Sequence, residues 1–180
     1  GFEAKEIAML EELAGDIGFA VGSFTQRTRL QYHLTTDAVT DLPNRFSLVE
    51  ALERKGVSAL AIINIDRFSD INDVYGITIG DAILSGYAHW LKRMIAAEPH
   101  ISLYKMGSDE YALVYEECND LSYCIAFLDR LIAMTQKESF VIEGIEIVLT
   151  ITVGIAPASE RVLEHATAAL KEAKRKRRSL

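Results

Sequence analysis

The sequence predicts an α+β fold (an α/β sandwich) in which helices flank a central, mostly antiparallel sheet. Three observations support this prediction. The run Val57–Ile65 is almost continuously apolar, as in a strand buried on both faces. The apolar runs 101–104 and 111–115 are separated by a few turn-forming residues, which indicates a β-hairpin. Amphipathic helical patterns lie between and after these runs, so helices are expected to cover the sheet.

An N-terminal helix is expected over about residues 4–34, ahead of the main domain at 35–180. Its apolar positions alternate by three and four, which is the pattern of a coiled-coil seam. Three glycines weaken this helix by up to about 1 kcal/mol each, which favours a helix that depends on a partner surface. We therefore expect a linker helix that pairs with its copy in a homodimer; packing only on its own domain is the alternative. It also resembles the last helix of a GAF-type sensory domain upstream. The seam consists of Ile7, Leu10, Ala14, Ile17, Val21, Phe24 and Thr28.

The remaining elements follow from local patterns. Pro43 fits the start of a helix that runs to about residue 55. Gly76 separates a short helix from a long amphipathic one, and the Glu143-Gly144 pair separates two strands. After the strand Val57–Ile65 the predicted ranges are helices at 67–74 and 79–97, the hairpin 101–115, a helix at 121–135, strands at 140–142 and 145–155, and a final helix at 162–177.

Composition excludes several classes of function. Of the 180 residues, 49% are hydrophobic and 25% are charged, as in an ordinary globular protein. The net charge of −7 gives no overall positive field, so neither nucleic acid nor a membrane is expected as a partner. No apolar stretch approaches the roughly 20 residues of a membrane span, and we expect a cytoplasmic protein. Cys118 and Cys124 have the spacing of neither metal ligands nor a redox pair, so reduced thiols are expected.

The hairpin turn carries the candidate chemistry. Gly107 and Ser108 precede two adjacent carboxylates, Asp109 and Glu110. Hard divalent cations such as Mg²⁺ bind oxygen ligands, commonly one or two carboxylates together with substrate phosphates. The turn is therefore a candidate site for a metal and a phosphate group, and a solvated acidic turn is the alternative.

Several motifs in order along residues 35–180 resemble those of the GGDEF family. Residues 37–45 resemble its D-x-L-T-x-L-x-N-R opening, and residues 65–81 resemble its second block. Residues 107–111 stand where the name-giving motif belongs, and 150–155 resemble the T-x-S-x-G-I strand. Ala173 and Lys174 with Arg178 resemble the closing A-K-x-x-x-R.

This resemblance implies a fold like that of nucleotide cyclases and polymerase palms. It also implies a role in cyclic di-GMP signalling. Diguanylate cyclases of the family use Mg²⁺ or Mn²⁺ to condense two GTP into cyclic di-GMP. Each domain holds one GTP, and two domains face each other in a dimer.

Site residues are carried over by position. The resemblance implies metal ligation by Asp109, by the backbone carbonyl of Ile65 and by whatever residue stands at position 64. It implies that Glu110 acts on the 3′-hydroxyl or a second metal, and that Asn72 and Asp81 bind the guanine edge.

The resemblance also implies a phosphate site. Phosphates would be bound by Lys174 and Arg178, with Arg67, Phe68, Gly107 and Ser108 lining their pocket. Asn72 and Asp81 could instead be helix-end polar residues, and Asp66 either caps the short helix or lies near the metal. The other charges of 171–178 are expected to face solvent.

The departures from the family pattern are informative. Asn64 stands where the family has its strand-end metal-binding Asp, so the site loses one negative charge and holds its cation weakly, if at all. Ser69 replaces a phosphate-binding Lys, and Ser108 replaces the second glycine of the turn. Lys105 replaces an Arg. The R-x-x-D motif of product inhibition, which would span 98–101, is absent.

Three functions remain open from the sequence. We favour a degenerate GTP-binding module that regulates an attached effector, such as an EAL-type phosphodiesterase. The alternatives are an active diguanylate cyclase and a structural, dimerising module without nucleotide.

Overall fold

The computed structural model describes residues 4–54, 56–118 and 120–178. The chain divides into two units between Thr35 and Thr36, one residue after the boundary that the sequence predicts. The described part of the first unit is a single 32-residue helix, α1 (Ala4–Thr35). The large apolar residues of its seam are 48–73% exposed, namely Ile7, Leu10, Ile17, Val21 and Phe24. Ala14 is also exposed, and the side chain of Thr28 lies outside the described part.

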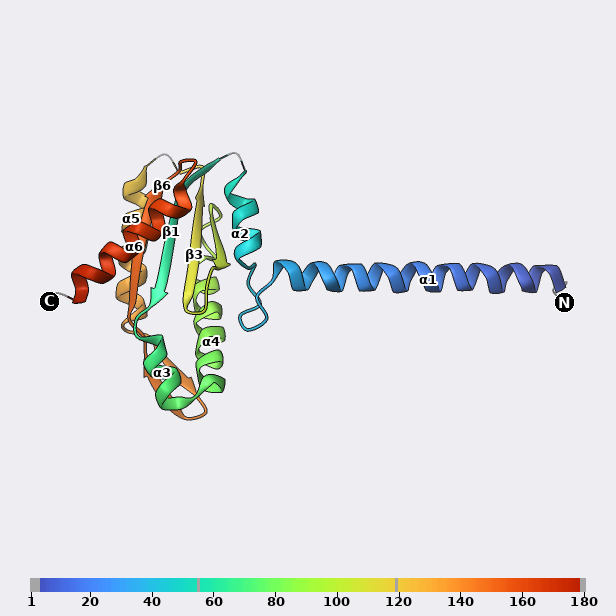
Figure 1. The fold of residues 1–180 in the computed structure, drawn as a ribbon, viewed down its shortest axis with the longest axis horizontal. Coiled ribbons are helices and arrows are strands. Elements are labelled where there is room, and N and C mark those ends of the chain that lie inside the picture. Colours follow the sequence, from blue (N-terminus) through green and yellow to red (C-terminus); the bar gives the residue numbers. More distant parts are fainter. Residues whose placement is uncertain (1–3, 55, 119, 179–180) are drawn as a thin grey trace. The chain divides into compact units, whose positions relative to one another are not determined.

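The second unit is built on a four-stranded antiparallel sheet with the strand order β2-β3-β1-β6 (Figure 1). A separate two-stranded sheet pairs β4 with β5. This confirms the predicted helix-flanked antiparallel sheet. The strands are β1 (Val57–Ile65), β2 (Ile101–Lys105), β3 (Glu110–Glu116), β4 (Ser139–Ile142), β5 (Ile145–Val148) and β6 (Ile151–Pro157). The helices of this unit are α2 (Arg45–Leu52), α3 (Phe68–Tyr75), α4 (Ile77–Ile95), α5 (Leu121–Thr135) and α6 (Val162–Arg178).

The central strand β1 is buried on both faces because alternate side chains enter two different cores. Ala61 and Ile63 belong to the core that includes residues of α4 and α5. Leu60 and Ile62 belong to the core that includes residues of α2 and α6. A strand covered on both faces has no polar side, which explains the continuous apolar run in its sequence.

Two expected elements need correction. The strand predicted over 145–155 is two strands, because Leu149 and Thr150 separate a half that pairs with β4 from a half that pairs with β1. Asp66 does not cap α3: Arg67 is the cap residue, with φ of 53°, and no side chain caps that end. Periodicity could not reveal the first break, since both halves are similarly apolar. In the described part of the chain, no helix combines the length and the apolarity required to traverse a bilayer.

Candidate active site

Strand pairing brings the end of β1 against the hairpin turn. Asn64 lies opposite Glu110 on one side and Thr152 on the other. The backbone N–H of Ile65 donates to the carbonyl oxygen of Asp109 at 3.0 Å. Directly opposed residues of a sheet share a face, so Asn64, Glu110 and Thr152 form a polar row across three strands. The register therefore places the predicted metal-binding positions next to one another.

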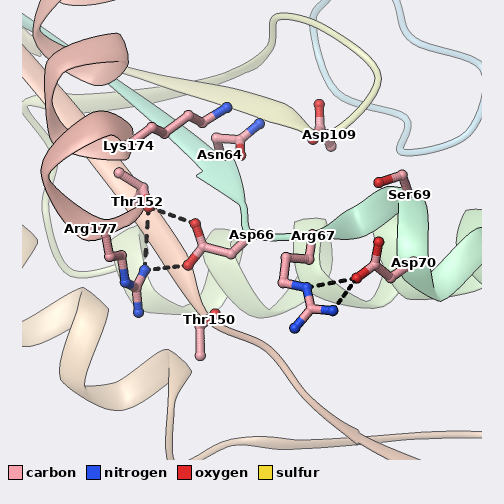
Figure 2. A pocket seen from close by; sticks show the side chains of 10 residues that line it. All are labelled: Asn64, Asp66, Arg67, Ser69, Asp70, Asp109, Thr150, Thr152, Lys174 and Arg177. Carbon is pink, nitrogen blue, oxygen red and sulfur yellow. Dashed lines mark hydrogen bonds and ion pairs between the residues drawn. The ribbon is translucent and has the colours of Figure 1, made fainter. Parts of the chain in front are cut away.

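A cavity of about 720 Å³ opens at this polar end of the sheet (Figure 2). Its walls come from the end of β1, the start of α3, the hairpin turn, β6 and the last turns of α6. The lining residues are Asn64, Asp66, Arg67, Ser69, Asp70, Asp109, Thr150, Thr152, Lys174 and Arg177.

Of the three cationic residues that line this cavity in the described part of the chain, two are already paired. Arg67 donates from Nε to Asp70 at 2.6 Å. Arg177 forms an ion pair with Asp66, and it also donates to the carbonyl oxygen of Ile151 at 3.0 Å. Lys174 has no ion pair among the described residues, and Figure 2 shows its side chain reaching from α6 over the cavity. Among the described lining residues, Lys174 is therefore the cation that is available for a phosphate group.

Asp66 is held by neighbours rather than free to bind a ligand. Its Oδ1 accepts a hydrogen bond from the hydroxyl of Thr152 at 2.5 Å, and its Oδ2 pairs with Arg177. These contacts tie the end of β1 to β6 and α6. Arg177 is exposed, as expected for this helix end, but it also makes this link. The side chain of Arg178 lies outside the described part of the chain, so its predicted phosphate contact stays a prediction.

Lys105 organises the hairpin turn from the other face of the sheet. It is only 4% exposed, and its Nζ donates to the carbonyl oxygens of Gly107 and, at 2.7 Å, of Ser108. Nζ also lies 4.9 Å from the ring centroid of Tyr111.

The environment of Lys105 also affects its charge. Burial lowers the pKa of Lys105, while the charges of Asp37, Asp109 and Glu110 act in the opposite direction. The sequence indicated a charged position here but not a buried one.

A second polar cluster lies between α3 and α4. The Oδ1 of Asn72 is buried and has no hydrogen-bond partner in the described structure. A Cβ on Gly80 would lie 1.9 Å from this oxygen and 3.3 Å from the ring of Phe68. Asp81, the next residue, is exposed. An unpaired buried acceptor is costly, so a ligand that donates to Asn72 would be favoured here.

The structure therefore divides the predicted site residues into groups. Asn64, Arg67, Asp109 and Lys174 line one cavity, whereas Phe68, Asn72 and Asp81 belong to α3 and α4 outside its lining. Gly107, Ser108 and Glu110 lie on the turn or at the start of β3, and Ile65 is fully buried at the end of β1.

The cavity also contains residues that the sequence did not predict. The cavity residues without a predicted role are Asp70, Thr150, Thr152 and Arg177. Of these, only Thr150 and Thr152 occupy specified positions of a quoted motif, the T and the S of T-x-S-x-G-I.

The donor set fits a hard cation with few protein ligands. Among the described residues, no group of three or more His, Cys, Asp or Glu side chains could hold a metal ion. Asn64 and Asp109 nevertheless supply an amide oxygen and a carboxylate to the same cavity. This set suits Mg²⁺ or Mn²⁺ only when nucleotide phosphates complete the coordination.

Known proteins resemble this chain over most of its length. The family model for "Diguanylate cyclase, GGDEF domain" matches residues 34–180. The diguanylate cyclase DgcP of Pseudomonas aeruginosa is 32% identical over 153 residues, which is 78% of this chain and 22% of the relative. The diguanylate cyclase DgcZ of Escherichia coli is 26% identical over 163 residues, which is 87% of this chain and 52% of the relative. The chain thus spans from about a fifth to about a half of the length of these relatives.

Solved structures share the fold. The coiled coil and GGDEF domain of DgcB from Caulobacter crescentus, in complex with c-di-GMP, superposes with a TM-score of 0.82 at 22% identity. That match covers 94% of this chain and 95% of the other. The GGDEF domain of FimX from Pseudomonas aeruginosa gives a TM-score of 0.71 at 20% identity, over 79% of this chain and 94% of the other.

Proposed function

This chain belongs to the GGDEF family of diguanylate cyclase domains, and from that premise we propose that its residues 35–180 form a degenerate, GTP-binding regulatory domain with weak or no cyclase activity. The observation that carries the proposal is Asn64. It is 4% exposed at the end of β1, in the cavity that also holds Asp109 and Lys174. The neutral amide leaves a bound dication with one carboxylate less than the family pattern supplies.

GTP binding can survive this loss because other residues contact other parts of the nucleotide. The ammonium of Lys174 is free to pair with β- or γ-phosphate oxygens, together with Arg178 by family position. The unpaired Oδ1 of Asn72 can accept from the guanine N–H groups, and the exposed carboxylate of Asp81 can do the same. These contacts fix the base and the terminal phosphates without a strongly held metal.

Catalysis places a stricter demand on the site than binding does. A divalent ion, when bound, would supply charge stabilisation to the reacting phosphate. Asp109 and the Asn64 amide would hold that ion with one formal negative charge between them. Glu110, opposite Asn64 in the sheet, would accept the proton of the 3′-hydroxyl. We infer that the weakened ligand set reduces turnover more than it reduces nucleotide affinity.

Two features favour a signalling context. The exposed seam of α1 suits a homodimer, and facing domains would provide a second contact between copies. The relatives are longer than this chain, which supports attached domains in general. We propose an upstream GAF-like sensor and an EAL-type phosphodiesterase as these domains. We propose a cytoplasmic location for this assembly.

An active diguanylate cyclase is the second candidate. It is favoured by the two carboxylates of the turn, Asp109 and Glu110, which are both retained next to the end of β1. An amide oxygen can replace a carboxylate oxygen as a ligand at a cost in affinity. The two candidates differ in turnover rather than in fold.

Restoring the family's carboxylate at position 64 tests the proposal directly. We expect Asn64→Asp to increase Mg²⁺-dependent GTP affinity by at least about tenfold, about 1.4 kcal/mol, because a second carboxylate then neutralises the cation. Calorimetry with GTP in Mg²⁺ and in EDTA gives the affinities, and chromatography detects cyclic di-GMP. Asn44→Asp is the matched control, since Asn44 caps α2 outside the cavity and Asp caps equally well.

The unmodified chain should bind GTP and form little or no cyclic di-GMP. Steady accumulation of product by the unmodified chain would establish the active cyclase instead. Absence of any heat with GTP would leave a structural module. Equal affinities for the unmodified chain and Asn64→Asp would mean that position 64 does not face the metal.

Gly80→Ala tests the guanine contact without touching the proposed contact itself. The new Cβ would lie 1.9 Å from Oδ1 of Asn72, so the amide must turn away while the helix keeps its shape. We expect GTP affinity to fall by about tenfold or more, whereas the free energy of unfolding changes by less than about 1 kcal/mol. Gly86→Ala on the same helix is the control, because its Cβ has no neighbour closer than 3.9 Å. Equal GTP affinity in both variants would place the base elsewhere.

A further inference from the structure

The two cysteines of the chain lie in contact although their spacing predicts no pair. The Sγ atoms of Cys118 and Cys124 are 3.4 Å apart. Cys118 follows the end of β3, and Cys124 lies in the first turns of α5. Helical side chains tilt toward the N-terminus of their helix, so Cys124 points back at the segment that precedes α5. This direction explains a contact that the sequence spacing does not reveal.

Hydrogen bonds from β1 and from the start of α5 position Cys118 for its contact with Cys124. The backbone N–H of Cys118 donates to Oγ of Ser58 at 2.8 Å. The Sγ of Cys118 donates to the carbonyl oxygen of Asp120 at 3.2 Å, and the carboxylate of Asp120 caps α5 by accepting from the N–H of Ser122 at 2.8 Å. The helix cap and strand β1 therefore position the Cys118 sulfur beside Cys124.

The two thiols differ in access. Cys118 is half-buried, while Cys124 is 1% exposed. Burial, with the contact to Cys118 second, raises the pKa of Cys124 to about 12. Tyr115 is also in the neighbourhood, and its buried hydroxyl has no hydrogen-bond partner in the described structure. An external reagent can reach Cys118 only, and Cys124 is placed to react with whatever Cys118 has bound.

We propose that Cys118 and Cys124 form a dithiol modification site whose oxidant is a low-molecular-weight disulfide. The Cys118 thiolate attacks one sulfur of the reagent, breaks its S–S bond and releases one small thiol. The Cys124 sulfur then displaces the second small thiol from Cys118 as the protein disulfide forms. Two protein thiols are oxidised, the reagent is reduced to two thiols, and the two thiol protons end on those products.

The site is separate from the nucleotide cavity. Cys118 follows the C-terminal end of β3, whereas Glu110 begins that strand beside the cavity. The disulfide would therefore link the residue after the end of β3 to α5. It does not depend on the function proposed for residues 35–180.

Cystamine, a small symmetrical disulfide, is the probe. The full chain is incubated with cystamine and then alkylated with iodoacetamide, and its intact mass is measured by mass spectrometry. We expect a loss of two hydrogen atoms, no alkylation at either cysteine, and full reversal by dithiothreitol. A stable half-cystamine adduct on the unmodified chain, or alkylation of either cysteine, would overturn the proposal. Both the expected result and the contrary results are measured on the unmodified chain, so the test does not depend on the folding of a variant.

Two variants assign the order of the steps. Cys124→Ala should retain one half-cystamine on Cys118, because no second thiol displaces it. Cys118→Ser should stay unmodified while folded, since Cys124 is buried. Modification of Cys118→Ser at Cys124 would contradict the proposed access through Cys118.

Discussion

Gly154→Ala is expected to lower the free energy of unfolding by about 3 kcal/mol. A Cβ at this position of β6 would lie 2.2 Å from the backbone nitrogen of Leu170, 2.6 Å from its Cα and 2.7 Å from the carbonyl oxygen of Ala166. These are backbone atoms of α6, which cannot rotate away as a side chain can. The helix would have to move off the sheet, and the packing of Ala166 and Leu170 in their core would be lost.

The same change should reduce nucleotide binding, because α6 carries Lys174 and Arg177 into the cavity. Urea unfolding followed by circular dichroism gives the free energy, and calorimetry gives the GTP affinity. Gly86→Ala is again the control, since its Cβ meets only ordinary contacts. An unchanged unfolding midpoint for Gly154→Ala would show that β6 and α6 are not in such close contact.

Lys105→Met should destabilise the domain by about 3 kcal/mol and weaken Mg²⁺-dependent GTP binding. Methionine keeps most of the side-chain volume but removes the ammonium that binds the carbonyl oxygens of Gly107 and Ser108. It also removes the positive charge that lies over the Tyr111 ring and near the acidic turn. The turn that carries Asp109 and Glu110 then loses its internal donor.

Lys105→Arg is the control for this experiment, because it keeps the charge and matches the family pattern. It should retain more of the stability and of the GTP affinity than Lys105→Met does. Thermal unfolding with and without GTP separates the two effects. If Lys105→Met unfolds at the same temperature as the unmodified chain, the buried ammonium does not support the turn.

The sequence was sufficient for those features that depend on local pattern. The bounds of β1 and α5 agree with the predicted ranges, because a continuous apolar run and an amphipathic period are local properties. The order of motifs was also sufficient to identify the family, which the family model confirms. The substitution of Asn64 was visible at once, since it needed only the motif and no coordinates.

Tertiary structure alone decided features that depend on which segments pair. The run 145–155 divides because its halves join different sheets, and strand partners are not encoded in periodicity. The charge of Arg177 looked like any other in a basic helix end, yet its register on α6 brings it to Asp66. Lys105 is buried because the strand places it against Tyr111 and the turn carbonyls.

The cysteines show the same division most clearly. A separation of six residues excludes the familiar motifs, but it does not determine the distance between two sulfur atoms. That distance depends on where β3 ends, where Asp120 starts α5 and which way a helical side chain tilts. Local propensities therefore determined the elements of this protein, and the order of its motifs identified the family. Packing and register, which bring distant residues into contact, determined the environment of each charge and thiol.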